Sequence, residues 1–94
     1  MLLTRFKIVG HSMQPTYQEN DNVLVSSIPV LFAKPKNGDV VVFEKFNRLY
    51  VKRIKSVKEG KYFLEGDNKS DSLDSRRFGE VKLEQIKGKV IIKL

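Results

Sequence analysis

Apolar and polar residues alternate with a period of two along most of the chain, and many apolar positions hold β-branched or aromatic residues. This pattern predicts short strands, separated by turns, in a compact, all-β and mostly antiparallel fold. We expect hairpin connections at Asn47-Arg48 and Glu59-Gly60, a loop at residues 36–39, and one short helical turn around Leu83–Ile86. The predicted strands are Phe6–Val9, Val23–Ser26, Asp39–Phe46, Leu49–Val57, Lys61–Leu64 and Gly88–Lys93.

Length and composition are those of one small globular domain. The 94 residues predict a single domain, residues 1–94, and a 40% share of apolar residues suffices for one core. Because the chain has no cysteine, disulfides, thiolate metal ligands and a cysteine nucleophile are excluded. We expect no cofactor and no metal site.

The charge balance is basic, with 18 Lys and Arg against 11 acidic residues and a net charge of +7. Such a surface attracts nucleic acid or an anionic membrane. The basic residues are spread along the chain without a tract, so we interpret them as a solvated surface. No apolar run approaches the roughly 20 residues that span a bilayer, and residues 1–10 do not form a signal peptide. We therefore expect a cytoplasmic or peripherally membrane-associated protein.

Two segments, residues 10–16 and 66–79, match neither a strand nor a simple turn. In the first, Pro15 forces a turn after a predicted strand, and Gly10 permits an unusual φ angle. Such a turn exposes the Ser12 hydroxyl and leaves its N–H outside the strand ladder, where it could face an oxyanion. Taken alone, a serine of this kind is more often a plain turn residue. The second segment is a long polar loop, and such loops are often functional.

A serine nucleophile needs a base, and the sequence offers a histidine or a lysine. The only histidine is His11, whose side chain points away from its neighbour Ser12 if the segment is extended, so a Ser-His-Asp triad lacks its histidine. Alternation over residues 49–57 gives one strand face made of Tyr50, Lys52, Ile54 and Ser56. Burial there would lower the pKa of Lys52 toward that of a general base. From this strand alone, a lysine whose amine reaches water at a sheet edge is the favoured interpretation.

Four segments, taken in order, resemble the bacterial signal peptidase I family from about Val9 to Val90. The stretch Gly10-His11-Ser12-Met13-Gln14-Pro15-Thr16 looks like the nucleophile box, and Gly38-Asp39-Val40-Val41-Val42-Phe43 resembles the strand that follows it. The general-base box is similar to Tyr50-Val51-Lys52-Arg53-Ile54. The last box is similar, with its spacing intact, to Gly66-Asp67-Asn68, Ser72, Asp74-Ser75-Arg76 and Phe78-Gly79.

This resemblance implies a serine endopeptidase with a Ser/Lys dyad that cleaves a leader or pro-segment from a precursor protein after small residues. Ser12 would attack the scissile carbonyl, neutral Lys52 would take its proton, and Ser72 would orient the amine. The residues implied as structural support are Gly10, Arg53, Asp67, Asp74 and Arg76, with the pairing of acids and arginines left open. Some family members carry a hydroxyl where this chain has Gly10, so the resemblance does not extend to that second oxyanion donor.

The sequence also departs from the usual members of the family, which carry N-terminal membrane helices and often an inserted domain. It resembles the short, anchorless members, some of which are proposed to mature a nickel superoxide dismutase precursor. Several apolar residues are expected either at a lipid-facing surface near the site or in the core and its rim. They are Leu2, Leu3, Phe6, Met13, Tyr17 and Leu31–Phe32. The expected partners are a precursor protein or peptide and, peripherally, a membrane surface.

Three other interpretations fit the sequence less well. A self-cleaving domain of the SOS-repressor type shares the dyad and a similar β-fold, but only eleven residues precede Ser12 and no helix-turn-helix is present. A basic β-barrel that binds nucleic acid explains the charge and the aromatic residues. It does not explain the order of serine, lysine and Asp-rich loop, so we expect no nucleic-acid partner. A degraded, inactive relative is disfavoured because all proposed dyad residues are present.

Overall fold

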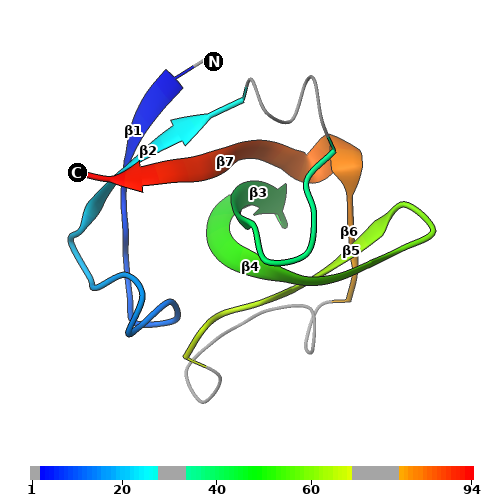
Figure 1. Cartoon of the computed structure of the whole chain (residues 1–94), viewed down its shortest axis with the longest axis horizontal. Helices are drawn as coiled ribbons and strands as arrows, with labels where there is room; N and C mark the ends of the chain where they lie inside the picture. The colour runs from blue at the N-terminus through cyan, green and yellow to red at the C-terminus, as the bar shows by residue number, and fades with distance from the viewer. Residues whose placement is uncertain (1–2, 28–33, 69–78) are drawn as a thin grey trace.

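The protein is an antiparallel sheet of seven strands with one short 3-10 helix, as a computed structural model that describes residues 3–27, 34–68 and 79–94 shows (Figure 1). The elements are β1 (Leu3–Lys7), β2 (Asn22–Ser26), β3 (Val40–Lys45), β4 (Arg48–Lys58), β5 (Lys61–Glu65), β6 (Val81–Lys82), η1 (Leu83–Gln85) and β7 (Ile86–Lys93). Their order in the sheet is β1-β2-β7-β3-β4-β5-β6. The prediction of an all-β, antiparallel fold with only a short helical turn is confirmed.

Several predicted boundaries were wrong. β1 begins at Leu3 rather than Phe6 and ends at Lys7, and the next residue, Ile8, is 3% exposed and packs into the core. The β3–β4 turn is formed by Phe46 and Asn47, both with positive φ, because Lys45 pairs with Arg48. The predicted turn at residues 59–60 is confirmed. β6 was missed because two residues are too few to display an alternation.

The face assigned to Ser56 was also wrong. In the pairing of β4 with β5, Ile54 lies opposite Leu64 whereas Ser56 lies opposite Phe63, so Lys55 is an extra residue that forms a β-bulge. Successive residues of β5 face opposite sides of the sheet, and Ser56 therefore faces away from Ile54. A bulge leaves no mark in the alternation of the sequence itself.

β3 is buried on both faces and separates two apolar cores. The first core contains Ile8, Met13, Val23, Val25, Val40, Val42 and Val90. The second core contains Val41, Phe43, Ile54, Tyr62, Leu64, Val81 and Ile86. Residues of β3 alternate between the two, which explains the uninterrupted apolar run at residues 40–43. Figure 1 shows β3 between β7 and β4, at the centre of the curled sheet.

Gly88 is required by a close approach of β7 to β2. A Cβ added at this position would lie 2.7 Å from Val25 Cγ1 and 3.0 Å from the carbonyl oxygen of Ser26. Because Val25 is fully buried, Gly88→Ala is expected to lower the free energy of unfolding by about 2 kcal/mol, the usual cost of overpacking. Chemical denaturation measures the change. The Val25→Ala background should reduce the cost of Gly88→Ala, and an equal cost in both backgrounds would contradict this explanation.

Candidate active site

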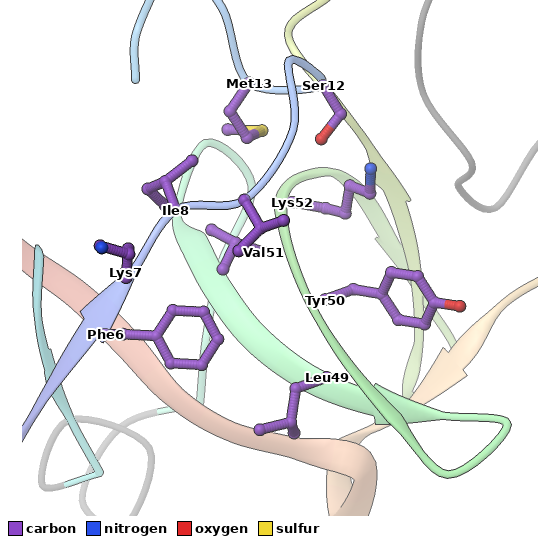
Figure 2. Close-up of a pocket in the computed structure, with 10 residues that line it drawn as sticks. Phe6, Lys7, Ile8, Ser12, Met13, Leu49, Tyr50, Val51 and Lys52 are labelled. Carbon is purple, nitrogen blue, oxygen red and sulfur yellow. The ribbon is translucent and has the colours of Figure 1, made fainter. Parts of the chain in front are cut away.

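A cavity of about 160 Å³ lies between the end of β1, with the chain that follows it, and the first half of β4. It is lined by residues 6–9, Ser12, Met13 and residues 49–52. Figure 2 shows the hydroxyl of Ser12 and the amine of Lys52 at the same end of the cavity, with their tips directed toward each other. Phe6 and Leu49 form its opposite, apolar end. The cavity thus combines one polar end with an apolar wall.

The turn that carries Ser12 is anchored from within and from below. Its backbone closes on itself, because the N–H of Gln14 donates to the carbonyl of His11 at 3.2 Å and that of Tyr17 donates to the carbonyl of Met13 at 3.0 Å. The Met13 side chain, 1% exposed, belongs to the first core. A buried side chain directly after Ser12 fixes the height of the turn above the sheet. The serine itself remains partly exposed at the cavity.

Gly10 enters this turn with a φ of +83°, the left-handed region that favours glycine. A Cβ at this position would meet no atom within 4 Å, so the requirement is conformational rather than steric. Its N–H donates to Glu19 Oε2 at 3.3 Å. Glu19 Oε1 in turn lies 3.7 Å from Nε2 of His11, whose side chain is exposed, as expected for a surface or loop histidine.

Lys52 is one of the most deeply buried polar residues among those described, with only 4% of its surface exposed. In β4 it lies opposite Val41 of β3, which is fully buried, and on the same strand face as Tyr50 and Ile54. A lysine whose amine reaches open water is therefore not what the structure contains. Burial of this kind disfavours the charged ammonium form. An amine must be uncharged to accept a proton.

Arg53, the neighbour of Lys52, joins the strand of the amine to the segment after β5. Its Nε and Nη2 donate to Oδ1 and Oδ2 of Asp67 at 2.8 and 2.9 Å, and its Nη1 donates to the carbonyl of Gly38 at 2.8 Å. Asp67 Oδ2 also accepts a hydrogen bond from Thr16 Oγ1. The two-point contact of a guanidinium with a carboxylate fixes both distance and orientation. Through its contacts with Thr16 and Arg53, Asp67 therefore ties the Ser12 turn to β4.

The carboxyl group of Asp67 should make stability depend on pH. Its pKa lies below the ordinary value of 3.8, mainly because of the hydrogen bonds from Arg53, against the opposing effect of burial. A lowered pKa in the folded state contributes stability above pH 4 that is lost as the pH falls through the lowered value.

Asp67→Asn is expected to lower the free energy of unfolding by about 2 kcal/mol at pH 7, the typical loss for hydrogen bonds to charged groups. The difference in the free energy of unfolding between variant and wild type should become smaller below pH 4, where the wild-type carboxylate takes up its proton. Denaturation curves from pH 3 to 7 measure it. A gap that stays constant over this range would show that the contact is not electrostatic.

The remaining predicted residues either lie outside the described part of the chain or pack in or near the first core, except for the exposed Leu3. Ser72, Asp74 and Arg76 lie outside the described residues, as do Leu2, Leu31 and Phe32 of the expected apolar surface. Met13 is a core residue and not part of a lipid-facing surface, because it is fully enclosed by the first core. Leu3 is 58% exposed, and Phe6 and Tyr17 pack partly buried against the first core.

Sequence reasoning missed the roles of Thr16 and Asn68. Asn68 donates its backbone N–H to the carbonyl of Ser12 at 2.8 Å and its side-chain Nδ2 to the carbonyl of His11 at 3.1 Å. Both residues stand in the segments that the sequence analysis marked as unusual. Thr16 follows Pro15 and Asn68 lies two residues after Gly66, which was the available signal, but the contact partners could not be identified without the fold.

Two features are absent from the described part of the chain. It has no cluster of three or more His, Asp or Glu side chains placed to hold a metal ion. Within the same residues, no helix has the length and apolar character needed to cross a membrane.

A hydroxyl and a buried amine on one cavity, in a curled antiparallel sheet, are suited to acyl transfer. Comparison with known proteins agrees with this class. The sequence matches the family described as "Signal peptidase, peptidase S26" over residues 1–57 and 50–94. The chain belongs to this signal peptidase family.

Three relatives illustrate the similarity. "Inactive signal peptidase IA" of Staphylococcus aureus is 36% identical over 59 residues, which cover 57% of this chain and 34% of that protein. The chain thus spans about a third of that relative's length. "Signal peptidase I V" of Bacillus subtilis is 27% identical, with 88% of this chain and 80% of that protein covered. "Mitochondrial ATP-independent inner membrane protease subunit 1b" of Arabidopsis thaliana is 31% identical, with 87% and 64% covered.

Proposed function

We propose that this protein is a serine endopeptidase in which Ser12 is the nucleophile and Lys52 the general base. Its substrates would be precursor proteins, from which it cleaves a leader or pro-segment after small residues. One observation supports this proposal most: a nearly fully buried lysine and a turn serine line the same end of one cavity. Structural lysines are common, but a buried amine facing a hydroxyl across a cavity is what activation of a serine requires.

In the first half of the reaction, Ser12 Oγ attacks the carbonyl carbon of the scissile peptide while Nζ of Lys52 takes the hydroxyl proton. The carbonyl oxygen becomes an oxyanion. Within the described residues the Ser12 N–H has no hydrogen-bond partner, so it can donate to this oxyanion. Collapse of the intermediate breaks the C–N bond, Lys52 returns the proton to the leaving amine, and an ester on Ser12 remains.

In the second half, water attacks the ester carbonyl and Lys52 takes a proton from it. The C–O bond to Ser12 breaks, the serine recovers its proton, and the new carboxyl end of the product leaves. Ser72 would orient the Lys52 amine throughout, as the family resemblance implies. Gly38, Asp67 and Arg53 would support this geometry without touching the substrate.

The cavity's apolar wall supports an extended substrate with small apolar side chains next to the cut. Val9 and Leu49 line the cavity and yet are 81% and 53% exposed, which leaves an apolar rim at its mouth. We infer that this rim makes the peripheral contact with a membrane surface near which an apolar leader would be presented.

The proposal is tested by incubating the protein with a panel of precursor peptides that carry Ala-x-Ala sites and reading the products by mass spectrometry. Cleavage at one position, absent with the Ser12→Ala protein, is the expected result. Peptides that stay intact over the whole panel, including in the presence of lipid vesicles, would contradict it. The experiment is needed because family membership alone does not confer activity: the Staphylococcus aureus relative is named inactive.

A further inference from the structure

Asn68 holds both peptide units that flank Ser12. Its backbone N–H donates to the carbonyl of Ser12 at 2.8 Å. Its side-chain Nδ2 donates to the carbonyl of His11 at 3.1 Å. These two carbonyls belong to consecutive peptide planes that meet at the Cα atom of Ser12. One residue, fifty-six positions further along the chain, therefore contacts the nucleophile from both sides of its backbone.

This contact determines where the Ser12 N–H points. The carbonyl of His11 and the N–H of Ser12 belong to the same planar trans peptide, so they point in opposite directions. When Asn68 holds the carbonyl on its own side, the N–H must face the other way. That N–H is the group which the proposed mechanism uses as the oxyanion donor, and within the described residues it has no other partner.

The same contact determines the direction in which the Ser12 side chain leaves the backbone. Two peptide planes of fixed orientation set φ and ψ at the residue between them, and these angles set the direction of its Cα–Cβ bond. The turn's own hydrogen bond, from Gln14 to His11, ties the turn only to itself. Asn68 is different because it follows Asp67, which is paired with Arg53 beside Lys52. Asn68 thus holds Ser12 in a fixed position relative to β4, the strand that carries Lys52.

We propose that Asn68 is the positioning residue of the nucleophile: it aims the Ser12 N–H at the developing oxyanion and keeps the Ser12 hydroxyl aligned with Lys52. This inference rests on the function proposed above. In this role Asn68 acts through the backbone of Ser12.

The kinetic test compares Asn68→Ala, Asn68→Asp and the matched control Thr16→Val. Asn68→Ala keeps the backbone donor and loses the Nδ2 donor. It should lower kcat by about 10- to 100-fold with little change in KM, since a misaligned donor acts on the transition state. Asn68→Asp keeps the size of the side chain but puts a carboxylate beside a carbonyl oxygen, so its kcat should be lower still.

Thr16→Val removes another hydrogen bond between the same two segments without contacting the peptide planes of Ser12. It should lose stability to a similar degree as Asn68→Ala, with a clearly smaller loss of kcat. If Asn68 were merely structural, kcat would follow the melting temperature in all three variants, and Asn68→Asp would match or exceed Asn68→Ala. Either of these results would overturn the proposal.

A second measurement does not depend on activity. In nuclear magnetic resonance spectra of the 94-residue protein, a scalar coupling across the hydrogen bond between the Asn68 nitrogen and the Ser12 carbonyl carbon should be detectable. The order parameter of the Ser12 amide should fall in Asn68→Ala and not in Thr16→Val. If the wild type cleaves no peptide but this pattern is found, the proposed function fails and the positioning of Ser12 stands. Unchanged order at Ser12 in Asn68→Ala would overturn the positioning role whatever the activity.

Discussion

Ser12→Ala is expected to lower the cleavage rate by about 10⁴-fold or more, as the loss of a serine nucleophile does in other hydrolases. The melting temperature should stay close to that of the wild type, because the turn is held by the Met13 side chain and by backbone hydrogen bonds that alanine retains. Steady-state kinetics on a cleaved precursor peptide, together with a thermal melt, measure both quantities.

A matched control for this change is Ser56→Ala, which removes an exposed hydroxyl from β4 far along the same strand from Lys52. It should cleave at the wild-type rate. Persistent cleavage by the Ser12→Ala protein would mean that another group, or a contaminating protease, forms the acyl intermediate, and the assignment of the nucleophile would have to be abandoned.

Lys52→Met is expected to reduce kcat by about 10³-fold or more, because general-base catalysis and an activated nucleophile are lost together. Methionine has nearly the same length and volume, so it fills the space against Val41 without leaving a cavity. Removing a buried amine should leave the free energy of unfolding unchanged or higher by up to about 2 kcal/mol. Kinetics and denaturation of the same preparation test both parts.

Lys52→Arg separates a base from a mere positive charge. Arginine stays protonated at every accessible pH and cannot accept the serine proton. We expect it to be as inactive as Lys52→Met. Substantial activity in the arginine variant would indicate that the residue acts as a cation, which stabilises negative charge, and not as the base.

Much of the fold could be predicted because strand alternation and turn chemistry are local properties. The turn at residues 59–60 needs only two residues that accept positive φ, and both strands beside it alternate clearly. The bulge at Lys55 could not be predicted, since it arises from the register between β4 and β5. The two-sided burial of β3 was visible as an apolar run but did not reveal which side each valine faces.

The candidate site divides in the same way. Ser12 and Lys52 are predicted from residue chemistry and family resemblance, both of which are properties of the sequence. The pairing of Arg53 with Asp67 was left open, because only the fold decides which carboxylate meets which guanidinium. Asn68 belongs to the last box of the family resemblance, which implies no role for it. Its two contacts with the Ser12 turn are made to main-chain carbonyls, and a sequence carries no signal for those.

The central strand gives the protein an unusual dependence between its two halves. Met13, next to the proposed nucleophile, packs in the first core, while Lys52 lies on the face of β4 that covers the second core. Residues 40–43 of β3 supply side chains to both cores. The positions of the Ser12 turn and of Lys52 therefore both depend on the packing of β3. A change of a single methyl group in a β3 side chain should shift the Ser12 hydroxyl relative to the Lys52 amine while both cores stay folded, so the proposed activity should be lost before the molecule melts.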